Sequence, residues 1–124
     1  MIACARTTAT VIRTLHLRRE RARSAATGLL LATEVADYLV ARGLPFRTAH
    51  EVTGRIAREL HEAGKDFSAL SLAEWRSYHE LFDEGVFKAM TPEAAVAARR
   101  TPQSTNPAAV AKALEDVRRW LGQT

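Results

Sequence analysis

The residues best suited to chemistry by type and spacing are His50 and Glu51, because a His-Glu pair opens the H-E-x-x-H zinc motif. That motif needs a second histidine one helical turn later, so that both rings can reach the same ion. Position 54 is Gly54, and the next histidine, His61, lies about three turns further along a helix. The spacing therefore predicts no metal site, and His50 is interpreted as a helix-flank histidine with ordinary hydrogen bonds.

The other candidate groups form no better arrangement. Cys4 and His16 lie twelve residues apart, which does not make a nucleophile–base pair. Ser71 lies in no G-x-S-x-G turn and is better explained as a helix cap. Glu34 and Asp37 could act as acid and base only inside a cleft, and their simpler role is to complement a helix dipole. We therefore predict no catalytic, cofactor-binding or metal-binding residues.

Arginine gathers near the N-terminal end, above all in HLRRERAR, residues 16–23. Residues 1–28 carry a net charge of +5, and the remainder carries −1. The arginines of this segment are Arg6, Arg13, Arg18, Arg19, Arg21 and Arg23. Such a cluster could neutralise phosphates. No aromatic side chains interleave with it as a stacking platform requires, so a solvated arginine face is the simpler interpretation and nucleic acid the weakest alternative.

Composition favours one all-α domain. The chain has 124 residues, of which 47% are hydrophobic, 26% charged and only 6% aromatic. Cys4 is the sole cysteine, which excludes an intrachain disulfide and fits a reducing, cytoplasmic compartment. No apolar run approaches the roughly 18 residues of a membrane span. Arg6 and Arg13 interrupt the weak apolar stretch at the start, so we expect no secretory signal.

Hydrophobic periodicity predicts about five to six helices, built from helix-turn-helix hairpins. We expect no strand, because no segment alternates with period two for long enough. The predicted helices span residues 8–27, 30–42, 46–63, 72–81 and 92–100, with a last helix after Pro107, a turn at 83–90 and a loop at 101–106.

Local signals mark several helix ends. Gly43 suits the left-handed position after a helix, and Pro45 suits the first turn of the next. Ser71 and Glu74 have the spacing of a capping box, which Leu70 and Trp75 would flank as a hydrophobic staple. Val110, Leu114, Val117 and Leu121 form the expected apolar stripe of the last helix.

Four segments, in order, resemble the C-terminal part of argininosuccinate lyase, of the fumarase/aspartase-type lyase superfamily. They are LATEVADYLVARGLPFRTAHEVTG (31–54), LSL with Glu74 (70–74), LFDEGVF (81–87) and PEAAVAARR (92–100). The likeness extends over about residues 12–121. It departs from the family at residues 103–105, where Gln-Ser-Thr replaces a Gly-Gly-Thr turn, and at residues 77–80.

The resemblance implies a part in arginine biosynthesis, through an enzyme that releases fumarate from argininosuccinate. The base in that family is a serine on a mobile loop, G-S-S-x-M-P-x-K-x-N, which this sequence lacks. We therefore expect residues 1–28 to be the trailing end of a bundle helix and residues 29–124 a C-terminal-like domain. The chain should be inactive alone. It could be a split-enzyme partner, a remnant, or an interaction module without enzyme activity.

Association follows from the same interpretation. The apolar residues of the N-terminal segment would lack the cover that a helical bundle gives; they are Val11, Ile12, Leu15, Leu29 and Leu30. An exposed apolar stripe tends to recruit a partner. We expect self-association or binding to a catalytic lyase fragment.

Overall fold

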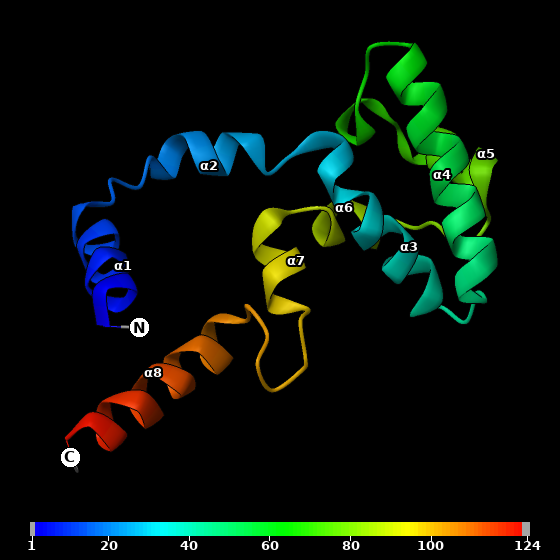
Figure 1. The fold of residues 1–124 in the computed structure, drawn as a ribbon. Coiled ribbons are helices and arrows are strands. Elements are labelled where there is room, and N and C mark those ends of the chain that lie inside the picture. The colour runs from blue at the N-terminus through cyan, green and yellow to red at the C-terminus, as the bar shows by residue number, and fades with distance from the viewer. Residues whose placement is uncertain (1, 123–124) are drawn as a thin grey trace.

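The structure is a computed structural model that describes residues 2–122, and helices are its only regular elements over that range (Figure 1). The all-α prediction is confirmed. The elements are α1 (Ile2–Thr14), α2 (Arg19–Ala25), η1 (Gly28–Leu31), α3 (Ala32–Val40), α4 (Phe46–Glu62), η2 (Phe67–Ala69), α5 (Leu72–Tyr78), α6 (Gly85–Ala89), α7 (Pro92–Ala97) and α8 (Pro107–Leu121).

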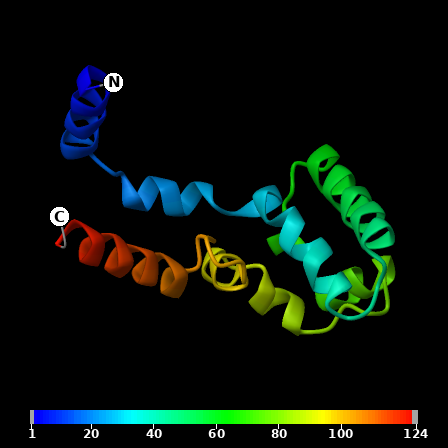
Figure 2. The ribbon, with the colours of Figure 1, turned by 60° about the horizontal axis from the view of Figure 1, so that its bottom comes forward.

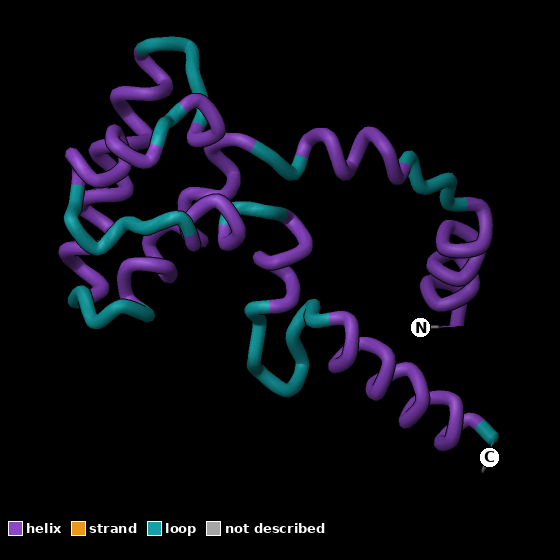
Figure 3. The backbone as a smooth tube through the Cα atoms, turned by 180° about the vertical axis from the view of Figure 1, so that it is seen from behind, coloured by secondary structure: helices purple, strands orange, loops and turns teal. Residues whose placement is uncertain are grey.

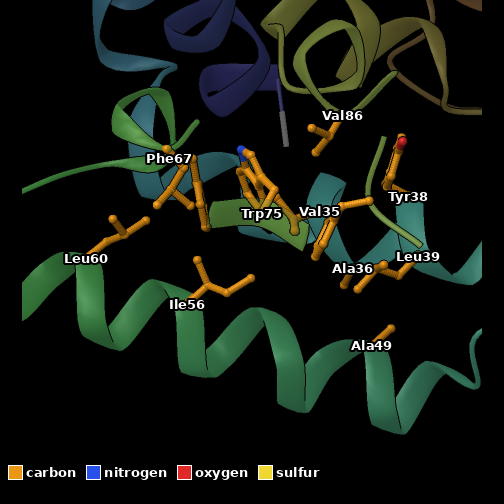
Figure 4. Close-up of a cluster of buried hydrophobic side chains, with 12 residues drawn as sticks. Val35, Ala36, Tyr38, Leu39, Ala49, Ile56, Leu60, Phe67, Trp75 and Val86 are labelled. Carbon is orange, nitrogen blue, oxygen red and sulfur yellow. The ribbon is translucent and has the colours of Figure 1, made fainter. Parts of the chain in front are cut away.

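The core is built on the hairpin of α3 and α4. Val35 and Leu39 on α3 face Ala49 and Ile56 on α4, and all four side chains are fully buried (Figure 4). The turn between the helices depends on Gly43, whose φ of +94° lies in the left-handed region that side chains disfavour. The left-handed conformation predicted for Gly43 is therefore confirmed, and the hairpin sets the frame on which the other elements pack.

An aromatic cluster closes the core against α5. Trp75 is fully buried, with ring centroids 5.7 Å from Phe67 and 4.8 Å from Phe82. The predicted capping box holds this helix. The Ser71 hydroxyl accepts a hydrogen bond from the Glu74 backbone N–H at 3.3 Å, and the Glu74 carboxylate accepts one from the Ser71 N–H at 2.7 Å. The cap therefore fixes the start of α5 and aims Trp75 into the core.

Three helices lie outside this core. None of α1, α2 or α8 has a buried residue. Figures 2 and 3 show α1 with α2 as one projection and α8 as another, both extending to the same side of the core. We call them the N-terminal arm (residues 2–25) and the C-terminal arm (residues 107–121). The molecule thus consists of a packed centre and two extended arms.

Asn106 joins the C-terminal arm to the core. Its side-chain oxygen accepts a hydrogen bond from the Ala108 N–H at 2.9 Å, which caps α8. Its side-chain N–H₂ donates to the Ala97 carbonyl at 2.8 Å, at the end of α7. The last helix predicted after Pro107 is confirmed, and the Asn106 side chain connects it to α7.

The single helix predicted over residues 8–27 is wrong. The segment forms α1 and α2, separated by residues 15–18. Arg19, Arg21 and Arg23 lie within α2, so their charges do not account for the break. Neither α1 nor α2 buries a residue, and without packing against the core a helix has little to carry it across residues 15–18.

Smaller corrections concern helix ends. The helix predicted over 30–42 starts as the 3₁₀ turn η1 and ends at Val40, and the one over 46–63 ends at Glu62. The helix predicted over 72–81 ends at Tyr78, because His79 is extended with φ −161°. The expected turn at 83–90 contains α6, and the helix expected over 92–100 ends at Ala97.

Candidate interaction surface

The structure separates the residues that the sequence singled out for chemistry. His50 lies on α4 with its ring centroid 6.0 Å from that of the exposed Phe46. Cys4 is exposed on α1. Over the described range, no three His, Cys, Asp or Glu side chains gather where they could hold a metal ion. Ser71 is the predicted cap, so no nucleophile–base pair emerges from these residues.

Glu34 has a role that the sequence did not predict. It lies in the first turn of α3, as the dipole argument requires, but it is buried. Its carboxylate accepts a short hydrogen bond from the Arg99 guanidinium, which also lies 3.5 Å from the Asp37 carboxylate. Arg99 follows α7, so this ion pair fastens the end of α7 to α3. Glu34 and Asp37 therefore have a structural role, which is to join the end of α7 to α3.

Asp83 forms a second polar junction, between α3 and α6. Its carboxylate accepts hydrogen bonds from the Tyr38 hydroxyl at 2.7 Å, the Gly85 N–H at 2.6 Å and the Arg42 guanidinium at 3.0 Å. The Tyr38 bond, then the other two, lower the pKa of Asp83 to about 2. Burial, then the bond to Asp83, raises the pKa of Tyr38. All of these groups are engaged with one another, which indicates a structural junction.

Unlike the paired polar groups described above, the apolar side chains of the N-terminal arm are exposed. Exposed fractions are 55% for Val11, 67% for Ile12 and 59% for Leu15, so the predicted lack of cover is confirmed for these three. Leu30 is 72% exposed, whereas Leu29 packs against the core and the prediction is wrong for it. A long, uncovered apolar stripe of this kind is typical of an interaction surface.

The threonine hydroxyls of α1 are hydrogen-bonded to the backbone of the same helix. Thr7, Thr8, Thr10 and Thr14 each donate a hydroxyl hydrogen bond to a carbonyl four residues earlier, at 2.9–3.1 Å. These side chains then present mainly methyl groups. Arg6 and Arg13, seven residues apart, are the only charged side chains of α1 and lie on one line. Most of the circumference of α1 could therefore enter an apolar environment.

The C-terminal arm also carries exposed apolar side chains. Val110, Leu114 and Val117 follow one another along one face of α8, and their exposed fractions are 42%, 52% and 52%. The predicted stripe is present, but the core of this chain does not cover it. Trp120 is also 64% exposed. Among the helices of residues 2–122, none is both long and apolar enough to cross a lipid bilayer.

Together, the fold and its exposed faces define a class: a small helical domain with a closed core and two arms that offer apolar stripes. Comparison with known proteins is specific. Residues 29–97 match the family model described as argininosuccinate lyase C-terminal. The chain belongs to this family, as the resemblance implied, and it matches the C-terminal region of argininosuccinate lyase.

Curated relatives extend the match beyond the core. Argininosuccinate lyase of Moorella thermoacetica is 43% identical over 112 residues, which are 90% of this chain and 24% of the relative. Argininosuccinate lyase of Thermus thermophilus is 44% identical over 109 residues, which are 87% of this chain and 24% of that relative. The chain thus spans about a quarter of the length of these relatives. The 112 aligned residues exceed the stretch 29–97 that the family model matches, so the likeness extends beyond it.

Proposed function

We propose that this chain serves as the C-terminal helical domain of an argininosuccinate lyase, docked through its two arms on the catalytic part of that enzyme. The exposed stripes on α1 and α8 carry the proposal. In this view residues 1–28 are the trailing end of a bundle helix and residues 29–124 form the domain itself, although Met1 and residues 123–124 lie outside the described range. We place the protein in the cytoplasm, as the compartment in which we expect its part in arginine biosynthesis.

The partner should offer an apolar surface that covers both arms. Val11, Ile12 and Leu15 on one arm, and Leu114 and Val117 on the other, are each more than half exposed. Full burial of such a side chain contributes about 1.5–3 kcal/mol, so covering these half-exposed ones contributes about half of that each, before the cost of association. The arms extend to the same side of the core, so one partner could engage both (Figure 2).

The domain by itself should lack lyase activity. Elimination needs a positioned base and a group that stabilises the developing charge. In the described residues the partly buried carboxylates near α3 are occupied by Arg99 and Arg42. The purified chain, incubated with argininosuccinate, should therefore release no fumarate above the buffer blank. Turnover by the chain alone would contradict this.

Fragment complementation tests docking. The chain would be mixed with the remaining, N-terminal part of the Moorella thermoacetica enzyme, and fumarate followed by absorbance. We expect activity that neither piece has alone. Replacing Ile12 and Leu114 by Ser should abolish it, whereas Arg47→Ala, on the exposed side of α4, should not. Equal activity with the Ile12/Leu114 variant would show that the stripes are not the docking surface.

Self-association through the same stripes is the second candidate function, because a protein-interaction module would use the same exposed residues. Light scattering over a concentration series distinguishes it from docking on a lyase. A mass that rises with concentration and falls in the Ile12/Leu114 variant would support it. A monomer throughout, with no complementation, would contradict both functions.

A further inference from the structure

A cleft of about 560 Å³ lies where the N-terminal arm meets the core. Its walls come from the end of α2, from η1 and the residue before it, from the turn η2, and from the stretch that runs from α6 into the start of α7. Figure 1 shows these segments around one region, with α2 above the start of α7. The size is within the usual range for small-molecule pockets.

The apolar part of the cleft is formed by Leu31, Phe67, Phe87 and Met90. Phe67 is buried and stacks on Trp75, so this wall is anchored in the core. Phe87 is 42% exposed, and its ring is therefore accessible to a ligand. An aromatic face of this kind can bind a flat apolar group or a cation.

The charged groups of the lining are one arginine, Arg23, and two carboxylates, Asp66 and Glu93. The lining thus carries a net charge of −1 in a chain whose overall charge is +4. The charge of the lining therefore favours a cation.

One oxygen of the Asp66 carboxylate is accessible to a positively charged group. One carboxylate oxygen, Oδ1, accepts hydrogen bonds from the Ser68 N–H and hydroxyl at 2.8 Å and 2.5 Å. These bonds lower the pKa of Asp66 and keep it ionised. Oδ2 has no hydrogen bond within the described part of the chain, and it lies 3.4 Å from where a side chain at Gly28 would begin. The glycine therefore leaves this oxygen uncovered.

The second carboxylate already binds a planar cation. Glu93 forms an ion pair with Arg23 at 2.5 Å, and the two side chains are 61% and 71% exposed. A pair so exposed contributes little to stability and can exchange partners. Arg23 therefore neutralises part of the lining.

We propose that this cleft binds a small organic monocation with a flat apolar body, its charged head directed to the Asp66 carboxylate and its body against Phe87. Arg23 competes with the ligand by neutralising Glu93. The docking proposed above uses the apolar residues of α1 and α8, and of the residues that line this cleft only Arg23 belongs to an arm.

Benzamidine is a suitable probe, and benzamide, its neutral isostere, is the matched control ligand. Each would be titrated into the full chain while backbone amide chemical shifts are followed. We expect benzamidine to shift Gly28, Ser68 and Phe87 in a saturable way, and benzamide to bind about two- to fivefold more weakly or not at all. Equal binding of both ligands, or shifts spread over the chain, would overturn the proposal.

Variants sharpen the test. Asp66→Asn keeps the Oδ1 acceptor for Ser68 and removes the charge, so it should weaken benzamidine by about two- to fivefold. Glu51→Gln, which removes a carboxylate from the exposed side of α4, should not change it. Arg23→Ala should tighten benzamidine, because the lining then carries −2. Unchanged affinity in both Asp66→Asn and Arg23→Ala would show that charge does not select the ligand.

Discussion

Helices α4 and α8 have the same kind of sequence but opposite surroundings. They have 17 and 15 residues, and each carries apolar side chains at helical spacing. On α4 that face is buried, with Ile56 at 0% and Leu60 at 4% exposure. On α8 the corresponding face is about half exposed, as Leu114 and Val117 show. Periodicity therefore indicates that a face needs cover, and it does not say whether the same domain provides it.

The two tryptophans test this difference most strongly. Trp75→Ala should cost about 3–5 kcal/mol of unfolding free energy, because it empties the centre of the aromatic cluster. Trp120→Ala, on the arm, should cost no more than about 0.5 kcal/mol. Urea denaturation measures both. Similar losses would mean that α8 folds back onto the core in solution.

The Arg99 ion pair gives the next largest effect. Arg99→Ala leaves the buried Glu34 carboxylate without its cation and should cost about 1–3 kcal/mol. The matched arm variant, Lys112→Ala, breaks an exposed pair with Asp116 and should cost at most about 0.5 kcal/mol. Adding Glu34→Gln to Arg99→Ala should recover part of the loss. No recovery would mean that Arg99 acts through packing alone.

Two glycines of the hairpin should respond in opposite directions. Gly43→Val forces a branched side chain to φ +94° and should cost about 1–3 kcal/mol, although no atom lies near enough to clash. Gly54→Ala, inside α4 and also without a nearby atom, should stabilise by about 0.4–1 kcal/mol. Thermal melts of both variants measure this. A neutral Gly43→Val would show that the turn can adopt another conformation.

The smallest effect concerns pH. The pKa of Asp83 is depressed to about 2, so its junction stabilises the fold above the unfolded value near 4. That contribution should be lost as the pH falls from about 4 through 2. Melting temperatures between pH 5 and 2 should therefore fall less steeply for Asp83→Asn than for the natural chain. Parallel curves would mean that other carboxylates dominate acid unfolding.

Much of the core was predictable from local sequence patterns. The hairpin of α3 and α4 follows from its stripes and from Gly43 and Pro45, and α5 follows from Ser71 and Glu74. These signals act within a few residues, so they can be read along the chain.

Other features were not predictable, because they depend on distant parts of the chain. Arg99 meets Glu34 across 65 positions, and Asp83 meets Tyr38 across 45. No spacing rule connects such residues. The break between α1 and α2 was also missed, since periodicity alone does not register that the core gives these two helices no packing. The cleft at Asp66 draws on four separate segments, which only the fold brings together.

Asn106 lies at the joint between the core and the C-terminal arm, so a small rotation there becomes a large displacement at the far end of α8. The helix beyond it is about 22 Å long at 1.5 Å per residue, and its direction is set where one amide side chain bonds both α7 and α8. A rotation of about five degrees at that joint would move the far end of α8 by about 2 Å and leave the core unchanged. Asn106 therefore helps to set the direction of α8, and with it the shape of the surface that the two arms offer to a partner.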